Sequence, residues 1–198
     1  MKKIIKPTVK ILLLSLVIFA GYYGYVLKFS GTSKIRYIEP QKELTSFKEL
    51  LQKPELKGKI LYVDVWRTTC HPCLEDFKAA PELKQYFNKY GQKVAFLYLG
   101  ADISVPGEEF RWKRMIKNKN LAGYHYFMSK EYFLRMWYEV VKDTTIPPSF
   151  PHYFIVNPQG EVIDDNAPRP TNKRLYVILE DAIANNFKLT ANNNYENR

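Results

Sequence analysis

The chain of 198 residues is poor in side chains that bind metals or carry thiols. It has only two cysteines, Cys70 and Cys73, and three histidines. A structural zinc site needs four ligands, commonly from two cysteine pairs, but no second pair exists, and His125 and His152 lie far away in the sequence. A purely structural disulfide is also a poor interpretation, because a loop of about four residues constrains the unfolded chain little. Redox chemistry of the cysteine pair is the favoured interpretation.

Other absences narrow the class of function. The sequence holds no internal repeat, no glycine-rich phosphate loop and no hydrolase triad. Residues 1–36 contain seven lysines and arginines and no acidic residue. The rest of the chain carries 23 basic and 20 acidic residues, so most of the formal net charge of +10 belongs to the N-terminus. This distribution is not that of a nucleic-acid-binding surface, and we expect no nucleic-acid partner.

The two cysteines end the segment VDVWRTTCHPC, residues 63–73, in which an apolar run leads through a short polar link into Cys-His-Pro-Cys. If a helix opens here, Cys70 lies at its N-terminal end, where unpaired N–H groups and the helix dipole favour a thiolate. That position lowers the pKa of the Cys70 thiol below the free value of roughly 8.5. His71 adds positive charge when protonated, and Pro72 suits a helix start because it lacks an N–H.

This segment resembles the active-site segment of the thioredoxin fold, a strand followed by W-x-x-x-C-x-P-C. Trp66 and Asp64 stand where thioredoxins carry a tryptophan and a buried acid. With an apolar segment upstream, residues 40–187 are similar to the membrane-anchored TlpA/ResA-like branch of thiol–disulfide oxidoreductases. The resemblance implies a thioredoxin-like α/β fold, with a central mixed β-sheet flanked by helices and an N-terminal transmembrane helix. Thr69 replaces an aromatic residue usual in that family, which bears on the docking surface beside Cys70 and not on the chemistry.

The resemblance also implies roles for the site residues. Cys70 attacks as a thiolate, and Cys73 resolves the mixed disulfide. Asp64 accepts a proton from Cys73 through water as that thiol ionises. The alternative is an Asp64 at a strand end that simply reaches solvent, since a buried carboxylate is costly without water or a partner.

Three prolines crowd the loop within residues 144–156, before an expected strand. In the thioredoxin fold a cis-proline lies directly before such a strand, against the dithiol, and the residue before it pairs with a substrate chain. Pro151, with Phe150 before it, has that position, whereas Pro147 and Pro148 are read as trans loop stiffeners. The expected substrate-binding residues are Trp66, Thr69, Phe150 and Pro151.

An N-terminal segment, Ile11 to Leu27, is uncharged and mostly apolar. As a helix it would reach about 25 Å, slightly short of a hydrocarbon core of roughly 30 Å, and the flanking Lys10 and Lys28 can extend to the interfaces. The lysines before it keep the N-terminus cytoplasmic. A cleaved signal peptide is the alternative, although Ile18 makes cleavage after Ala20 a poor site. Either way the domain is exported. We expect a single-pass protein of the inner (cytoplasmic) membrane with the catalytic domain on the periplasmic side.

The rest of the pattern predicts the order of elements. The expected regions are a cytoplasmic basic N-terminus at 1–10, a transmembrane anchor at 11–27, a linker at 28–43, the thioredoxin-like domain at 44–187 and a disordered tail at 188–198. The expected strands are 35–39, 60–65, 94–99, 152–156 and 161–163, and the expected helices are 46–51, 73–90, 108–119, 130–141 and 173–187. Pro81 should kink the helix at 73–90, and the aromatic helix at 130–141 is read as core packing, with a partner groove as the alternative.

The sequence therefore predicts a membrane-tethered thiol–disulfide oxidoreductase that needs no cofactor and no metal. The resemblance favours a reductant of disulfides in exported proteins, such as apocytochrome c cysteines, served by a membrane electron donor or acceptor of dithiols. A thiol oxidase or isomerase of exported proteins is the alternative within redox chemistry. A non-catalytic anchored binding module and a carrier of soft metals such as copper remain open.

Overall fold

The computed structural model describes residues 35–39, 44–102 and 104–195, together with positions 15, 16, 19 and 21. The chain divides into two units, Met1–Ser33 and Lys34–Arg198, and the fold belongs to the second. Among the residues so described, no helix combines the length and apolarity that crossing a bilayer demands. Most of the expected anchor at 11–27 and most of the linker at 28–43 lie outside these residues, so both stay predictions.

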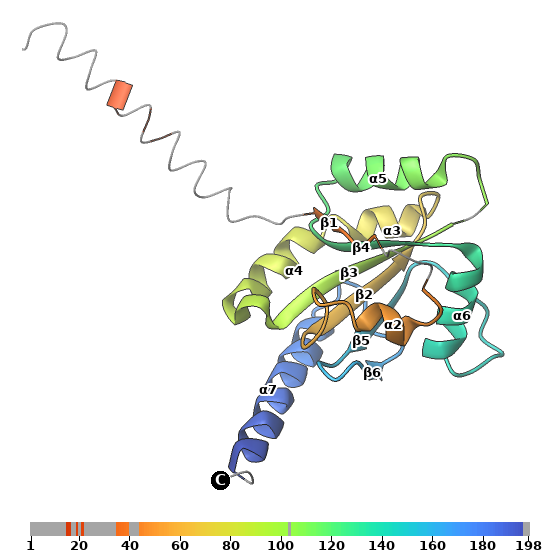
Figure 1. Ribbon diagram of the computed structural model, residues 1–198. Helices are drawn as coiled ribbons and strands as arrows, with labels where there is room; N and C mark the ends of the chain where they lie inside the picture. Colours follow the sequence, from red (N-terminus) through yellow and green to blue (C-terminus); the bar gives the residue numbers. More distant parts are fainter. Residues whose placement is uncertain are drawn as a thin grey trace, which may run out of the picture. The chain divides into compact units, whose positions relative to one another are not determined.

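A six-stranded sheet forms the centre of this unit (Figure 1). Its spatial order is β1-β4-β3-β2-β5-β6, in which the first four strands run parallel and the last two run antiparallel to their neighbours. The expected mixed sheet is confirmed. The strands are β1 (Ile35–Tyr37), β2 (Ile60–Trp66), β3 (Val94–Ala101), β4 (Gly123–Met128), β5 (His152–Val156) and β6 (Val162–Asp164).

Helices cover both faces of the sheet (Figure 1). Buried side chains of α2 and α6 pack on one face, whereas those of α3, α4, α5 and α7 pack on the other. The helices are α2 (Phe47–Leu51), α3 (His71–Asp76), α4 (Ala80–Phe87), the 3₁₀ helix η1 (Asn88–Lys93), α5 (Glu108–Asn118), α6 (Lys130–Val140) and α7 (Arg174–Tyr195).

The two central strands, β2 and β3, are buried at every position. Both are nearly continuous apolar runs, which is typical of parallel strands covered on both faces. Asp64 is the one charged residue in either strand. The chain passes from β2 through α3 and α4 to the parallel β3, the expected crossover. Reactive groups in such sheets gather at the carboxyl ends of the strands, and the cysteines follow β2 directly.

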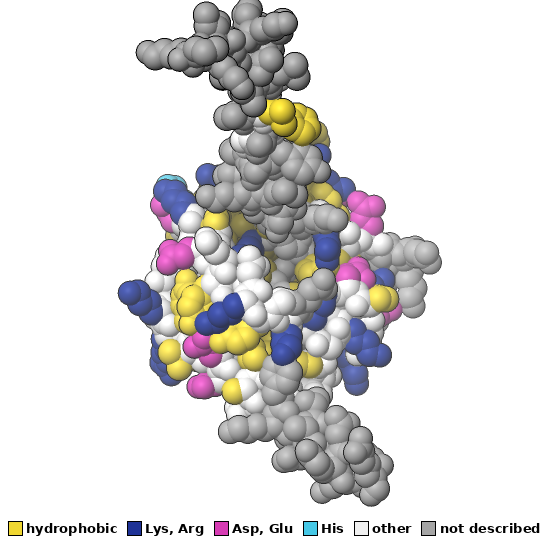
Figure 2. Space-filling model, turned by 90° about the vertical axis from the view of Figure 1, so that its left-hand side faces the viewer, with side chains coloured by type: hydrophobic (Ala, Val, Ile, Leu, Met, Phe, Trp, Pro, Cys, Tyr) yellow, Lys and Arg dark blue, Asp and Glu magenta, His cyan; other side chains and the backbone are white. Residues whose placement is uncertain are grey.

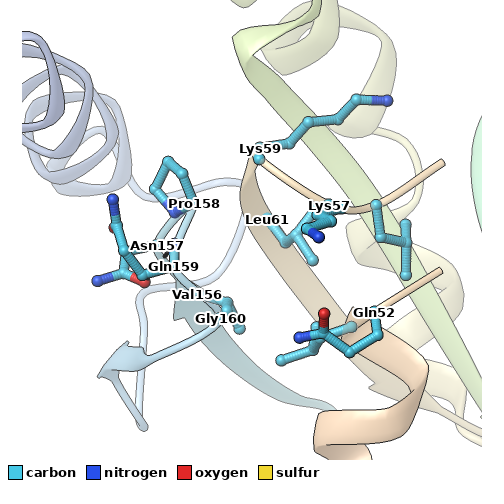
Figure 3. Close-up of a pocket in the computed structure, with 12 residues that line it drawn as sticks. Gln52, Lys57, Lys59, Leu61, Val156, Asn157, Pro158, Gln159 and Gly160 are labelled. Carbon is cyan, nitrogen blue, oxygen red and sulfur yellow. Dashed lines mark hydrogen bonds between the residues drawn. The ribbon is translucent and has the colours of Figure 1, made fainter. Parts of the chain in front are cut away.

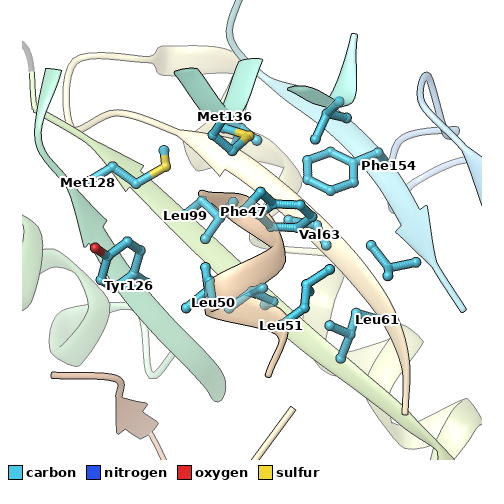
Figure 4. Packing of buried hydrophobic residues seen from close by; sticks show 14 of the residues in the cluster. Phe47, Leu50, Leu51, Leu61, Val63, Leu99, Tyr126, Met128, Met136 and Phe154 are labelled. Carbon is cyan, nitrogen blue, oxygen red and sulfur yellow. The ribbon is translucent and has the colours of Figure 1, made fainter. Parts of the chain in front are cut away.

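The first apolar layer lies between the sheet and helices α2 and α6. In Figure 4, Phe47, Leu50 and Leu51 of α2 point toward Leu61 and Val63 of β2. The aromatic helix α6 contributes its buried face to the same layer, which confirms its reading as core packing rather than a partner groove. The buried residues of α6 are Tyr132, Phe133, Met136, Trp137 and Val140.

The second apolar layer holds the cysteines. It lies between the sheet and helices α3, α4, α5 and α7, and both Cys70 and Cys73 belong to it. Phe77, just past α3, contacts the Trp66 ring edge-on with centroids 4.9 Å apart and the Tyr98 ring at 5.9 Å. The cysteine helix is therefore anchored on the carboxyl half of β2 and β3.

Charges of both signs are spread over the surface. Figure 2 shows Lys and Arg side chains interspersed with Asp and Glu side chains and with apolar ones on one face of the molecule. Exposed pairs such as Lys78–Glu75 and Lys113–Glu109 join neighbouring turns of a helix or helix end. Solvent-exposed ion pairs contribute little to stability. The two apolar layers are therefore the main source of folding free energy.

The cysteine helix differs from the expected single helix at 73–90. It begins earlier, at His71, and ends at Asp76; α4 then begins at Ala80. Pro81 lies in the first turn of α4, where its missing N–H costs nothing. A proline at that position starts a new helix, so the chain turns between α3 and α4 instead of kinking within one helix.

Strand β4 was not expected, since residues 101–146 outside the helices looked irregular. Its sequence GYHYFM is short and aromatic, its backbone pairs with β1 and β3, and its side chains enter the apolar layers on both faces of the sheet. His125 at its centre is fully buried and stacks on Tyr98, with ring centroids 5.0 Å apart. Several boundaries differ as well: β6 lies one residue later than expected, for example, and α7 continues past Phe187 to Tyr195, into the segment expected to be a disordered tail.

Gly100 offers a test of the second layer. It pairs with Trp66 in the β2–β3 register, and the Trp112 indole of α5 packs on it so closely that a methyl group added at Gly100 would overlap Trp112 Nε1. We expect Gly100→Ala to lower the free energy of unfolding in urea by about 1–3 kcal/mol, because a packed core resists added volume.

Shortening the indole should relieve that clash. The combined variant Gly100→Ala, Trp112→Leu is expected to lose less stability than the sum of the two single variants. Strict additivity would mean that the two positions do not share this contact.

Candidate active site

The chain's two cysteines form a disulfide at the start of α3. Cys70 and Cys73 are bonded, with their Cα atoms 5.3 Å apart. Cys70 is the N-cap residue, and the backbone N–H of Cys73 donates to its Sγ at 3.2 Å. The relative exposure is 5% for Cys70 and 0% for Cys73, so of the two cysteines Cys70 alone has exposed surface. The expected position of Cys70 at the end of a helix is confirmed.

The N-terminus of α3 favours negative charge on this sulfur. The first N–H groups of a helix have no intrahelical acceptor, and their dipoles add to a partial positive charge. Pro72 lies in the first turn, where it removes a donor that would otherwise be unpaired. His71 and Pro72 are both exposed beside the disulfide. After reduction, a Cys70 thiolate would retain the Cys73 N–H as a hydrogen-bond donor.

The turn that leads from β2 into α3 is bonded to α5. The Cys70 N–H donates to the Arg67 carbonyl at 3.0 Å, which closes the turn. The Thr68 hydroxyl donates to Glu108 Oε1 at 2.5 Å, and Glu108 also pairs with Arg111 at 2.9 Å. Both Thr68 and Glu108 are buried. This buried link fixes the position of the first cysteine relative to the sheet.

Thr69 and Trp66, both expected to contact substrate, have different surroundings. Thr69 is exposed immediately before Cys70, where a docking chain could reach it. Trp66 is completely buried beneath α3, with its ring against Phe77. An indole covered in this way supports the cysteine helix from below and has no free surface for a substrate.

Asp64 is buried on the face of β2 that carries Tyr62 and Trp66. Only 3% of it is exposed, and its Oδ1 has no hydrogen-bond partner among the described residues. Tyr98 of β3 and Tyr153 of β5 stand opposite it in the sheet register. Burial, helped by the charge of Asp76, raises the pKa of Asp64 well above its ordinary value. The alternative of a solvated strand-end carboxylate is therefore wrong.

Lys84 of α4, which the sequence analysis did not single out, is a half-buried cation near this carboxylate. Its ammonium donates to the Ala122 carbonyl and lies 4.8 Å from the centre of the Tyr98 ring. Burial lowers the pKa of Lys84 to about 7, and the negative charge of Asp64 acts in the opposite direction. The available signal was its position, since Lys84 shares the apolar face of its helix with Phe87 and Ala80.

A second buried carboxylate, Asp76, lies at the end of α3 and was also missed. Its Oδ2 accepts from the Tyr153 hydroxyl at 2.6 Å and from Arg169 Nε at 2.7 Å. Arg169 Nη2 also donates to the Pro72 carbonyl at 3.4 Å. Asp76 and Arg169 are 93 residues apart, so no local pattern could reveal their pairing.

The peptide bond between Phe150 and Pro151 is cis, as expected, and is the one cis bond in the part of the chain that the structure describes. Pro151 directly precedes β5, whose His152 pairs with Val65 next to the end of β2. Phe150 stacks on Phe133 of α6 with centroids 5.2 Å apart. The guanidinium carbon of Arg67 lies 5.1 Å from the centre of the Phe150 ring. This stack lies where the turn to the cysteines begins.

A shallow hollow lies at the opposite end of β2 from this site. Figure 3 shows Leu61 and Val156, two paired strand residues, beside the turns that carry Lys57 and Gly160. Because β2 separates it from Trp66 and the cysteines, the hollow is not part of the redox site. Among the described residues, no group of three or more His, Cys, Asp or Glu side chains is arranged to hold a metal ion.

Comparison with known proteins identifies the fold. No protein-family model and no curated protein matches the chain. A solution structure of a candidate thiol-disulfide oxidoreductase from Bacteroides vulgatus is 24% identical with a TM-score of 0.50, and the match covers 66% of this chain and 77% of that chain. The thioredoxin domain of a thiol-disulfide oxidoreductase from the same organism is 22% identical with a TM-score of 0.49, covering 63% and 79%. A candidate thioredoxin from Neisseria meningitidis is 19% identical with a TM-score of 0.46, covering 66% and 79%.

The first of these similarities shows that the fold is thioredoxin-like. The fold expected from the resemblance of VDVWRTTCHPC is thereby confirmed for the unit that holds the sheet.

The buried carboxylate of Asp64 predicts a pH dependence of stability. Because the pKa of Asp64 is raised above 3.8, the folded oxidised protein binds a proton there more tightly than the unfolded chain does. The free energy of unfolding should therefore fall as the pH rises above that ordinary value, until Asp64 is ionised in the folded state. Asp64→Asn removes this loss. We expect the variant to be more stable than the natural protein at about pH 7, by about 1 kcal/mol or more.

The measurement is urea unfolding of the oxidised proteins at several pH values between about 4 and 7. Asp181→Asn, an exposed carboxylate of α7, serves as the control and should follow the natural protein. If the free energy of unfolding depends on pH in the same way in Asp64→Asn and Asp181→Asn, ionisation of Asp64 does not destabilise the folded state.

Proposed function

We propose that this protein is a thiol–disulfide oxidoreductase that exchanges disulfides with exported proteins. The observation that carries the proposal is the Cys70–Cys73 disulfide at the N-terminus of α3, directly after the carboxyl end of a central strand. A four-residue disulfide adds little stability, whereas a helix N-terminus stabilises the thiolate that such exchange requires. The relatives of similar fold include proteins described as thiol-disulfide oxidoreductases, which is consistent with this chemistry.

In the reducing direction, the Cys70 thiolate attacks one sulfur of a substrate disulfide. A mixed disulfide forms, and the other substrate sulfur leaves as a thiolate that takes up a proton. Cys73 then loses its proton, attacks the Cys70 sulfur and releases the first substrate sulfur as a thiolate. Two electrons pass from the dithiol to the substrate, and the Cys70–Cys73 disulfide remains.

Asp64 is the proposed acceptor of the Cys73 proton, through water. Both residues belong to the same side of the sheet, since Asp64 shares a strand face with Trp66 and Cys73 packs in the layer above that face. A carboxylate whose pKa burial raises can hold a proton nearer neutral pH than an ordinary aspartate can. Its acid form would then return the proton when the disulfide is reduced again.

The proposed docking surface surrounds Cys70. Thr69, His71 and Pro72 are exposed beside it, and Phe150 and Pro151 are partly exposed. A substrate chain would pair in strand fashion with the backbone at Phe150, since Pro151 itself has no N–H to donate and Phe150 keeps both backbone groups. We propose that the physiological direction is reduction of exported disulfides, of the cytochrome c maturation type, with electrons from a membrane dithiol donor. The support for that direction is the resemblance to TlpA/ResA-like proteins, and an oxidase or isomerase is the alternative.

The proposed membrane tether is the apolar segment 11–27 with its flanking lysines. It would place the domain on the periplasmic side of the inner membrane, where thiols are oxidised and disulfides form. The proposed partners are therefore exported proteins that carry thiols or disulfides and a membrane protein that passes electrons to or from the dithiol.

A second candidate is a binding module with an idle disulfide. The near-complete burial of both cysteines favours it, because an idle disulfide has no need of an exposed sulfur. The two candidates differ in whether Cys70 forms mixed disulfides with other thiols.

Replacement of each cysteine separates the two roles. We expect Cys73→Ser to accumulate a mixed disulfide with a disulfide-bonded model peptide, because the thiol that resolves it is missing. Cys70→Ser should form none and should lose exchange activity, since Cys73 is fully buried. The measurement is mass spectrometry of the adduct after acid quenching. Reversed behaviour of the two variants would reverse the roles, and no adduct with either would favour the binding module.

His71 is expected to tune the Cys70 thiolate. In His71→Ala the loss of the imidazole should raise the pKa of the Cys70 thiol and make the Cys70–Cys73 couple more reducing, because a nearby positive charge favours the thiolate and so the reduced form. The measurement is the equilibrium of the couple with glutathione, and Thr69→Ala serves as the matched control. An unchanged equilibrium in His71→Ala would show that the imidazole has no electrostatic part.

A further inference from the structure

The carboxylate of Asp76 lies one helical turn beyond Cys73 and has two fixed donors. Only 2% of Asp76 is exposed. Its Oδ2 accepts from the Tyr153 hydroxyl at 2.6 Å and from Arg169 Nε at 2.7 Å. Asp76 and Cys73, three residues apart, lie on the same side of α3. A buried negative charge is therefore held on the same side of the helix as the second cysteine.

Arg169 reaches this carboxylate from the loop between β6 and α7. Its side chain is 49% exposed, and its Nη2 donates to the Pro72 carbonyl at 3.4 Å. That carbonyl lies between the two cysteines in the chain. The neighbouring Pro168 carbonyl accepts from the Tyr62 hydroxyl of β2 at 2.8 Å, which ties the loop to the sheet. The guanidinium thus bridges the Cys-His-Pro-Cys turn and the carboxylate at the other end of α3.

Other ionisable groups lie near the Asp76–Arg169 pair, on the side of the sheet that carries α3. Asp64 of β2 and the phenols of Tyr62 and Tyr153 lie near Asp76, Lys84 of α4 acts on Asp64, and His71 is exposed at the start of α3. Among them, Arg169 is the one that contacts both the backbone between the cysteines and a charge on α3.

We infer that Arg169 is a positioning residue for the dithiol, and that its ion pair with Asp76 sets the charge balance at the Cys70–Cys73 couple. The inference rests on the proposed function, because it concerns the redox equilibrium of the same site. The guanidinium holds the turn between the cysteines in place and contributes positive charge beside it. The carboxylate of Asp76 holds the guanidinium and contributes the opposite charge on the side of Cys73.

The two charges have opposite effects on reduction. A nearby cation stabilises a cysteine thiolate and so the reduced form, whereas a nearby anion destabilises both. Loss of the Arg169 charge should therefore make the couple more reducing, and loss of the Asp76 charge should make it more oxidising. A purely structural ion pair predicts something different, since either substitution would break the same contact and shift the equilibrium in the same direction.

The experiment measures the equilibrium constant of the Cys70–Cys73 couple with glutathione at neutral pH. We expect Arg169→Gln and Asp76→Asn to shift this constant in opposite directions, each by about threefold to tenfold, as expected of a unit charge at a partly solvated site. Arg169→Lys keeps the charge but cannot span both acceptors in the same way. It should therefore stay within about twofold of the natural protein while unfolding at lower urea concentration.

Matched controls change the same charges elsewhere. Arg174→Gln and Asp181→Asn lie on the exposed surface of α7 and should leave the constant unchanged. Shifts of the same sign in Arg169→Gln and Asp76→Asn, or no shift in either while both remain folded by circular dichroism, would overturn the inference. Failure of the natural protein itself to equilibrate with glutathione would instead overturn the proposed function.

Discussion

The active site depends on one hydrogen bond, from the Cys73 N–H to the sulfur of Cys70 at the first turn of α3. That bond makes a cysteine the N-cap of a helix, a position usually held by an oxygen-bearing side chain. The same donors that cap the helix in the oxidised protein are ready to stabilise a thiolate after reduction. The rest of the structure can be understood as support for this helix end.

The support comes from three directions. Trp66 and Phe77 hold α3 on the sheet from below. Glu108, through Thr68, fixes the turn that enters the helix. Asp76, through Arg169, fixes the backbone between the cysteines. Glu108 and Asp76 are both buried, and each accepts from one hydroxyl and one arginine, so these two carboxylates are paired.

The sequence predicts the parts of this site that are local. The apolar runs of β2 and β3 and the Cys-His-Pro-Cys helix start are visible within short segments, and the cis-proline before β5 follows from the resemblance of such a segment to the thioredoxin fold. Pairings between distant segments are not visible in this way, because Asp76 and Arg169 meet only when the chain closes on itself. The aromatic strand β4 was missed for a related reason, since both of its faces are covered by distant segments and its sequence shows no apolar–polar alternation. The complete burial of Trp66 is likewise a property of the helix packed above it.

The most direct test of the account is the pH dependence of the reactivity of Cys70. The reduced protein would be alkylated with iodoacetamide over a range of pH, and the rate would be followed by mass spectrometry of the Cys70 peptide. The account predicts a half-maximal rate at a pH clearly below roughly 8.5, the value of a free thiol. A half-maximal rate at or above that pH, or no reaction of Cys70 at all, would contradict it.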